Sequence, residues 1–378
     1  MNSIGMAGEK LYLRANVKVE PLVDSWYAWS HLISPATAAM NVMGRHLSIM
    51  KSYVQAPQVH TAAVKNPAML GGPFMDYKTP RVREIQDLIS WTEKNRGQML
   101  ELAAAIRQLD DLLRHKAKGY SMDPLYSEIP DPLRGYVELV YDLNNQPSFR
   151  LIEPLLYKSR YYDPSTQSLM LSLIDQDDRP FVLSTPRLPE NGDVHLKIPF
   201  AHPGIDQLFQ MKTEPQTFAA IKDALELPDE HDEPFSAFLT PEPPRSYPAY
   251  QGPGMRWRYF GHACILLETG NLNILLDPVL SYTYESDISR YTYDDLPEVI
   301  DYALITHNHQ DHILFETMLQ LRHKVRRIVV PRNGSGFLQD PSLRLLLQAI
   351  GFQNVIELDE MDTLTFPDGS ITGLPFLG

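Results

Sequence analysis

The chain has 378 residues, of which 43% are hydrophobic and 21% are charged, and its formal net charge is −13. This length suits two domains better than one, and the composition is that of an ordinary globular protein. The negative charge argues against a nucleic-acid-binding protein, which needs a surplus of Lys and Arg, and against broad electrostatic contact with anionic membranes.

The first residues hold no apolar run long enough for a signal peptide, and no later run approaches the length of a membrane span. Cys264 is the single cysteine, which excludes an intrachain disulfide framework and a thiolate-rich zinc site. It lies in an apolar, strand-like run, so we expect a buried side chain. We therefore expect a cytoplasmic protein with no nucleic-acid partner and no membrane contact.

Residues 1–227 are predicted to form an α+β domain. Apolar residues recur at helical spacing over residues 80–115, which predicts one long or two consecutive amphipathic helices. Short strand-like runs divided by Pro, Asn and Asp turns follow over residues 135–200. Seven prolines with interspersed acids then predict an extended, semi-rigid linker over residues 228–254.

Residues 255–378 have a different pattern. Two apolar, strand-like runs joined by a short turn come first, and a third strand leads into the segment ITHNHQDHI. Helices and strands alternate after it, which predicts a layered α/β domain. The segment ITHNHQDHI places three of the chain's 12 histidines, and an aspartate, within six positions.

The four ligand-type side chains of this segment are His307, His309, Asp311 and His312. In an extended conformation, residues two apart face the same side, so His307 and His309 can bind one metal ion. Asp311 and His312 follow where the chain turns toward a helix, and they would enter the same cavity to bind a second metal. Composition does not separate iron from zinc or manganese, because all three accept histidine and carboxylate ligands.

The spacing His-x-His-x-Asp-His, preceded by the paired strands YFGHACILLETGNLNILLDP, resembles the signature of the metallo-β-lactamase superfamily. The resemblance implies an αββα fold, of which residues 255–378 would be the N-terminal part. It also implies that His307 and His309 bind the first metal, and that Asp311 and His312 bind the second.

Two residues of the paired strands, His262 and Asp277, are expected near the pocket, outside the set of metal ligands. For each of them a purely structural role is an equal alternative. Asp311 is the residue of the motif that we expect to act in catalysis as well as in metal binding.

Nearly the whole chain resembles a narrower group. The segments SWYAWSHLISPATAAMNVMGRHL and RYTYDDLPEVIDYALITHNHQDHILFETMLQLRHKV are similar to the diiron non-heme β-hydroxylases of nonribosomal peptide biosynthesis, of the chloramphenicol-pathway amino-acid β-hydroxylase type. The resemblance implies two iron ions, dioxygen as co-substrate and an external electron donor. The substrate would be an amino acid tethered to a carrier protein of a nonribosomal peptide synthetase, hydroxylated at its β-carbon. We also expect a homodimer.

In this group the next metal ligand is a glutamate, expected directly after the segment GLPFLG, which ends at Gly378. The resemblance therefore implies a chain that is truncated within its metallo-β-lactamase domain and that carries half of the ligands. A metal ion held by these residues alone is expected to be weakly bound.

Two other functions stay open on the sequence. The first is a hydrolase of the same fold with two zinc ions, which would act on an ester, lactone or phosphodiester, with Asp311 helping to orient the attacking hydroxide. The second is a non-catalytic docking protein, since half of the ligand set is missing from the 378 residues.

Overall fold

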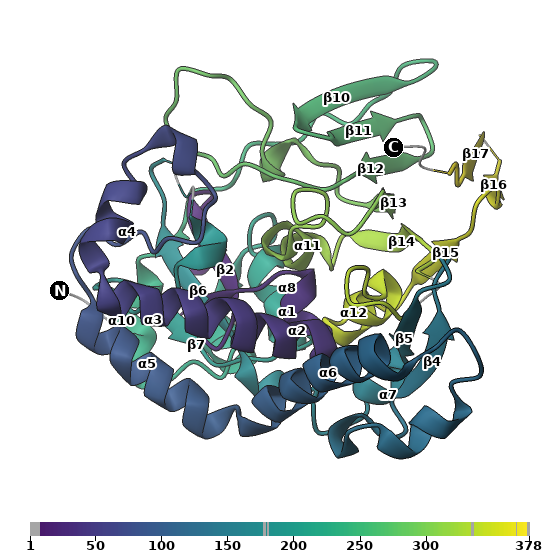
Figure 1. The fold of residues 1–378 in the computed structure, drawn as a ribbon. Coiled ribbons are helices and arrows are strands. Elements are labelled where there is room, and N and C mark those ends of the chain that lie inside the picture. The colour runs from purple at the N-terminus through teal and green to yellow at the C-terminus, as the bar shows by residue number, and fades with distance from the viewer. Residues whose placement is uncertain (1–7, 177–178, 180, 334–335, 368, 376–378) are drawn as a thin grey trace.

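The protein is described by a computed structural model that covers residues 8–176, 179, 181–333, 336–367 and 369–375. Figure 1 shows helices and small sheets of the first region (purple to teal) beside a larger sheet of the C-terminal region (green to yellow). No helix within the described ranges is long and apolar enough to cross a bilayer. The end of the GLPFLG segment, residues 376–378, lies outside the described residues.

The first region contains three small antiparallel sheets among its described residues. One has the order β3-β2-β6-β7, and its strands are β2 (Val17–Val23), β3 (Trp26–Tyr27), β6 (Gln167–Leu173) and β7 (Val194–Leu196). A second has the order β8-β1-β9, from β1 (Lys10–Leu13), β8 (Gln216–Thr217) and β9 (Leu239–Thr240). The third is a hairpin of β4 (Val137–Tyr141) and β5 (Pro147–Leu151).

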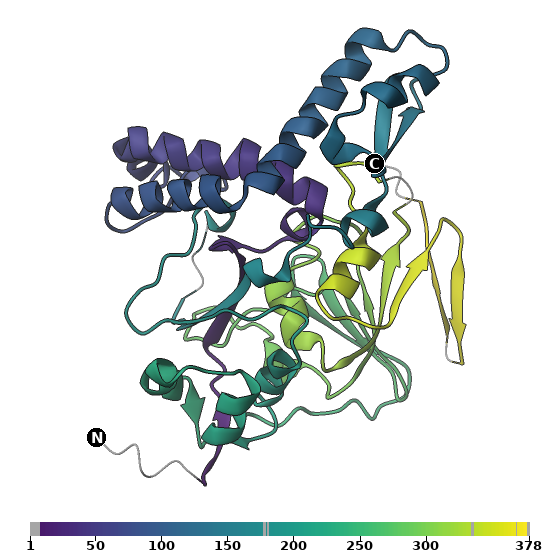
Figure 2. The same ribbon diagram turned by 90° about the horizontal axis from the view of Figure 1, so that it is seen from below.

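Residues 80–115 contain two consecutive helices, α5 (Val82–Asn95) and α6 (Gly97–Lys116). This is one of the two alternatives that the apolar spacing predicts. α5 packs beside α3 (Leu47–Gln55), and α6 extends from there to the β4–β5 hairpin (Figure 2). The shorter helices of the region are α1 (Ser30–Ile33), α2 (Pro35–Asn41), α4 (Pro57–Ala63), α7 (Glu153–Leu156), α8 (Pro203–Gln210), α9 (Phe218–Ala224) and α10 (Asp232–Ser236). Helices and sheets together confirm the α+β prediction.

The proline-rich stretch begins as folded structure. It contains α10 and β9, and the rings of Phe235 and Phe238 are buried in the core of the first region. Residues 241–255 then run to the next strand without a helix or strand. Of the linker predicted over residues 228–254, the first part is thus packed, because the two phenylalanines bury enough apolar surface to hold it in place. The domain boundary near Gly254 stays a prediction.

The C-terminal region is built on a six-stranded sheet whose strands follow the order of the sequence. They are β10 (Arg256–Gly261), β11 (Cys264–Glu268), β12 (Asn273–Leu276), β13 (Ile300–Leu304), β14 (Val325–Pro331) and β15 (Val355–Leu358). The first three strands pair antiparallel, and β12 to β15 pair parallel. Two helices connect parallel strands and a hairpin follows: α11 (Phe315–Leu321), α12 (Leu343–Ala349), β16 (Thr363–Phe366) and β17 (Gly369–Thr372). This is the layered α/β arrangement that the sequence predicts.

A continuous hydrophobic core joins the two regions. α11 packs against β2 and α8 of the first region, and all seven of its residues are buried. Phe200 and Phe209 of the first region share this core with Phe315 of α11. On the edge strand β10, by contrast, Trp257 and Tyr259 are 63% and 54% exposed. The loop from β13 to α11 therefore starts on the sheet and ends on a helix that is fixed between both regions.

Candidate metal centre

The histidine motif lies in the loop between β13 and α11. The backbone N–H of His312 donates to the carbonyl of His309 at 3.0 Å, which closes a turn within the motif. The turn brings the ring of His307 to centroid distances of 4.5 Å from His309 and 4.0 Å from His312. His307 Nε2 and His309 Nδ1 lie 2.9 Å apart. The loop thus gathers the two side chains expected to hold the first metal.

Asp311 and His312 face His262, which lies in the turn between β10 and β11. Asp311 Oδ2 is 2.9 Å from His262 Nε2 and 3.9 Å from His312 Nε2, and the two Nε2 atoms are 3.3 Å apart. Atoms bonded to one ion at about 2.1 Å lie roughly 3 Å apart, so the three donors have the spacing of a shared ion. His262 has a φ of 50°, which is uncommon for a residue with a side chain. The structure places it, as expected, beside the motif.

Asp277 holds the motif from the end of β12. Its side chain is 4% exposed and accepts hydrogen bonds from the backbone N–H and the hydroxyl of Thr306, at 2.8 and 2.9 Å. Its Oδ2 also lies 2.8 Å from Nδ1 of His312. A carboxylate at Nδ1 keeps the proton on that nitrogen and directs the unprotonated Nε2 toward the site. Asp277 therefore contacts the motif through His312 and Thr306.

The donor set fits metal ions that accept nitrogen and oxygen ligands. The motif and His262 offer imidazoles and a carboxylate, whereas the thiol of Cys264 is buried and burial raises its pKa to about 12. Burial, and then His312 and His309, lowers the pKa of His307, which favours the neutral ring that binds metal. Iron and zinc both accept these donors.

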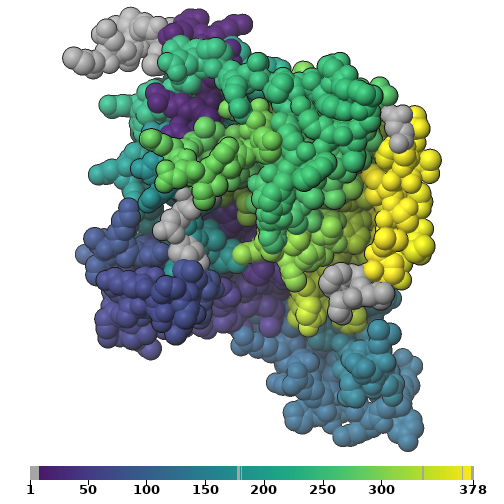
Figure 3. Space-filling view, turned by 90° about the horizontal axis from the view of Figure 1, so that it is seen from above, coloured from purple at the N-terminus to yellow at the C-terminus, as the bar shows by residue number. Residues whose placement is uncertain are grey.

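A pocket of about 330 Å³ opens beside the motif, between the two regions of the molecule. Figure 3 shows the surface hollowed between the purple and teal first region and the green C-terminal region. The lining residues are Tyr27, Arg179 and Val182 of the first region and His262, Val279, Gln310, Asp311 and Leu314 of the second. A pocket of this size holds a small organic group. A larger cavity, of about 500 Å³, lies in the first region beside Trp26 and His46, and no described residue of the motif lines it.

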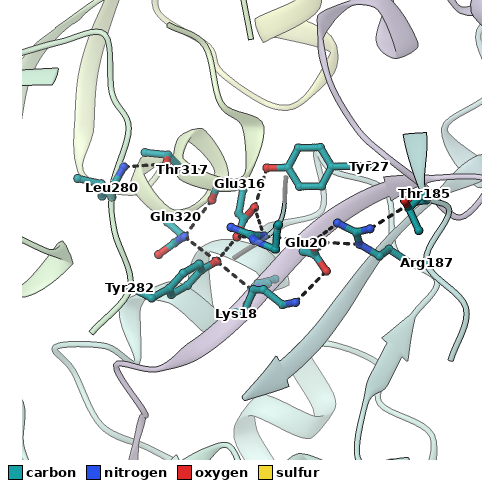
Figure 4. A network of polar contacts seen from close by, with 12 residues as sticks. Lys18, Glu20, Tyr27, Thr185, Arg187, Leu280, Tyr282, Glu316, Thr317 and Gln320 are labelled. Atoms are coloured by element: carbon teal, nitrogen blue, oxygen red, sulfur yellow. Dashed lines mark hydrogen bonds and ion pairs between the residues drawn. The ribbon is translucent and has the colours of Figure 1, made fainter. Parts of the chain in front are cut away.

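A buried polar network behind the pocket was not predicted from the sequence (Figure 4). Its centre is Glu316, in the first turn of α11, whose side chain is 2% exposed. The hydroxyls of Tyr27 and Tyr282 donate to its two carboxylate oxygens at 2.6 and 2.5 Å, and Arg179 Nη1 donates at 3.1 Å. Burial, and then Glu316, raises the pKa of both tyrosines well above its usual range, so their hydroxyls keep the proton. The sequence shows only that Glu316 is the single charged residue of this helix, which does not by itself indicate its partners.

Glu20 on β2 extends this network into the first region. Its buried carboxylate contacts Arg187 Nη2 at 2.8 Å, Arg179 Nη1 at 3.1 Å and Lys18 Nζ at 3.2 Å. Burial alone would raise the pKa of Glu20, but Arg187, Lys18 and Arg179 outweigh it and hold the pKa at about 2. Arg179 thus lies between a carboxylate of each region.

Known proteins match both regions of the chain. Residues 12–243 match the model of the diiron non-heme beta-hydroxylase N-terminal domain, and residues 256–375 match that of a beta-lactamase superfamily domain. The 4-amino-L-phenylalanyl-[CmlP-peptidyl-carrier-protein] 3-hydroxylase of Streptomyces venezuelae is 38% identical over 378 residues, which cover 97% of this chain and 70% of the relative. A UPF0173 metal-dependent hydrolase of Christiangramia forsetii is 29% identical over 129 residues, which cover 32% of this chain and 54% of that protein.

The solved structures agree with the sequence matches. The crystal structure of CmlA, a diiron beta-hydroxylase from Streptomyces venezuelae, superposes with a TM-score of 0.87 at 36% identity. The superposition covers 98% of this chain and 70% of that one. The similarity therefore extends over both regions of the chain.

Proposed function

The chain belongs to the family of diiron non-heme β-hydroxylases, and on this premise we propose that it hydroxylates the β-carbon of an amino acid tethered to a carrier protein. The observation that carries the proposal is the gathering of His307, His309, Asp311 and His312 in one loop, from which Asp311 also lines a small pocket between the two regions. The site thus combines metal-binding donors with room for an amino-acid side chain.

We propose two iron ions at the motif. His307 and His309 would hold the first ion, and Asp311 and His312 would hold the second, while the family pattern adds a glutamate directly after the GLPFLG segment. When bound, a diiron cluster supplies the capacity to bind and reduce dioxygen with electrons from an external donor.

The protein's own groups position these donors. Asp277 keeps the proton of His312 on Nδ1, so that Nε2 faces the site. His262 Nε2 lies 2.9 Å from Asp311 Oδ2, so it restricts the orientation of that carboxylate and would be close enough to bind the second ion with it. Asp311 faces both His312 and the pocket, which supports its predicted catalytic role.

The relative from Streptomyces venezuelae is named for its action on a 4-amino-L-phenylalanyl group on a peptidyl carrier protein. For this chain we propose an aminoacyl carrier protein of a nonribosomal peptide synthetase as the partner. The pocket accommodates the aminoacyl group and leaves the carrier protein outside. The external electron donor, the homodimer and the cytoplasmic location stay predictions.

The test uses the full-length protein, loaded with iron and supplied with a reductant, isotopically labelled dioxygen and aminoacyl carrier proteins. We expect the mass of the carrier-bound amino acid to rise by one labelled oxygen atom, and His307→Ala to abolish this gain. Release of the amino acid by hydrolysis without oxygen transfer, in a zinc-loaded protein, would support the hydrolase alternative.

A further inference from the structure

One wall of the pocket comes from the first region of the chain. Tyr27 on β3 and Val182, together with Arg179, line it opposite His262 and Asp311. The motif contributes its wall from the C-terminal region, far away in the sequence. The first region therefore shapes the space in front of the motif without belonging to the proposed set of metal ligands.

Glu316 fixes this wall relative to the motif. It is the fourth residue after His312, so its backbone moves with the motif and the first turn of α11. Tyr27 and Arg179 both donate to its carboxylate, and hydrogen bonds to a charged, buried acceptor are the strong ones. On the other side, the hydroxyl of Tyr282 donates to Glu316 and accepts from the backbone N–H of Val19.

The chemistry of the pocket combines an apolar surface with a cationic donor. Val182, Val279 and Leu314 offer aliphatic surface beside the ring of Tyr27, and Arg179 adds a guanidinium whose side chain is 22% exposed. A thioester-linked amino acid presents the matching groups, namely a side chain on the β-carbon and an acyl carbonyl oxygen that accepts a hydrogen bond.

We propose that Tyr27, Arg179 and Val182 recognise the aminoacyl group, and that Glu316 positions Tyr27 and Arg179 for this contact. The side chain of the amino acid packs on Val182 and the aliphatic residues opposite it, which selects apolar or aromatic side chains. Arg179 donates to the acyl carbonyl oxygen. This inference rests on the proposed function and adds to it the class of amino acid and the residues that select it.

The first experiment measures binding to the full-length, metal-loaded protein by calorimetry. The probes are amide analogues of phenylalanyl-pantetheine and alanyl-pantetheine, which resist hydrolysis. Val182→Phe fills the pocket from the first region, so it should weaken binding of the phenylalanyl analogue about tenfold and of the alanyl analogue less than about threefold. Equal effects on both analogues, or no effect, would overturn the proposal.

A second variant, Val182→Ala, guards against misfolding of the first. It enlarges the same wall, so binding of a tryptophanyl analogue should improve relative to that of the phenylalanyl analogue. An unchanged preference between the two analogues would contradict the assigned role of Val182.

A matched pair of variants tests whether the hydrogen bond to Glu316 positions Tyr27 for contact with the aminoacyl group. Tyr27→Phe and Tyr282→Phe each remove one hydroxyl that donates to Glu316, but Tyr27 alone of the two lines the pocket. We expect Tyr27→Phe to raise KM about fivefold at unchanged metal content, and Tyr282→Phe to lower thermal stability with less than about a twofold change in KM. Equal changes in KM would show that both tyrosines are merely structural.

These measurements separate the two proposals. If the wild type binds the phenylalanyl analogue but transfers no oxygen to any carrier-bound amino acid, the hydroxylase function fails and the recognition of the acyl group stands. If the wild type hydroxylates a carrier-bound amino acid but the Val182 variants keep the wild-type preference among the analogues, the proposed recognition of the acyl group is wrong and the hydroxylase function stands. A wild type that binds none of the analogues contradicts the recognition directly.

Discussion

Two clusters of polar side chains lie on opposite sides of His312 along the chain, and they differ in exposure and in partners. Asp311 precedes it and is 54% exposed, at the edge of a pocket. Glu316 follows it and is 2% exposed, with hydrogen bonds from two tyrosines and an arginine. The donors of the first cluster mainly contact one another, whereas Glu316 is surrounded by partners from both regions of the protein.

This difference distinguishes an exposed binding site from a buried network that stabilises the contact between the two regions. Exposed charged pairs add on the order of 0–1 kcal/mol to stability, so the motif can exchange its contacts for metal at little expense to the fold. Breaking a buried pair leaves an uncompensated charge, at about 3–5 kcal/mol. A variant in the motif should therefore change metal binding and leave stability unchanged, whereas a variant of Glu316 should do the reverse.

The largest effect is expected from the motif itself. His307→Ala and Asp311→Ala should each remove one proposed ligand, lower the metal content of the full-length protein and abolish hydroxylation. The unfolding free energy of the metal-free protein should change by less than about 0.5 kcal/mol, because both side chains lie in an open loop. Elemental analysis and denaturant unfolding check the two statements. Unchanged stoichiometry and activity in either variant would mean that the ligands are wrongly assigned.

Glu316→Leu should show the reverse pattern. It leaves two buried tyrosine hydroxyls without their acceptor and removes one of the two carboxylates that Arg179 contacts, so we expect a loss of about 3–5 kcal/mol in unfolding free energy. Glu316→Gln is the matched control, since its amide oxygen still accepts one of these bonds and the loss should be smaller. Denaturant midpoints measure both variants. Equal midpoints for Glu316→Leu and the wild type would show that Glu316 does not stabilise the contact between the two regions.

Glu20 gives the network a pH dependence. The pKa of Glu20 in the folded protein is about 2, below the usual value of 4.5. The ionised carboxylate therefore adds its full share to the unfolding free energy above pH 4.5, and this share is lost as the pH falls toward 2. The shift corresponds to about 3 kcal/mol of unfolding free energy. Glu20→Gln should lower stability near neutral pH and flatten this acid-side decline. A variant that declines as steeply as the wild type between these pH values would assign the effect to other carboxylates.

Asp277→Asn should have the smallest effect, and we expect it mainly in the affinity for metal. The amide cannot fix the proton of His312 on Nδ1 as the carboxylate does, so metal affinity should fall roughly 10- to 100-fold. Competition with a chelator measures this affinity. Asp277→Asn combined with His312→Ala provides the control, because Asn should then add little to the loss. Additive losses would show that Asp277 does not act through His312.

The two clusters also show what a sequence can reveal. The motif is local: four ligand-type side chains stand within six positions, and a single loop brings them together. Its spacing, and the resemblance that it carries, are sufficient to predict these four residues as metal ligands. Glu316 gave no such signal, since Tyr27 and Arg179 reach it only after the first region has packed on α11.

The proline-rich stretch also shows that local composition does not reveal packing between distant residues. Its composition predicts an extended linker, and residues 241–255 have no helix or strand. Phe235 and Phe238, however, bury their rings in the core of the first region. Local composition cannot show that a distant core accepts these side chains, and tertiary packing decides where the linker begins.

The central claim is that the motif belongs to a diiron oxygenase. The most direct measurement is elemental analysis, with an optical spectrum, of the full-length protein expressed without added metal. We expect two iron ions per chain and near-ultraviolet absorption from their ligands. Two zinc ions and a featureless spectrum, as a filled d shell gives, would contradict the claim and favour the hydrolase.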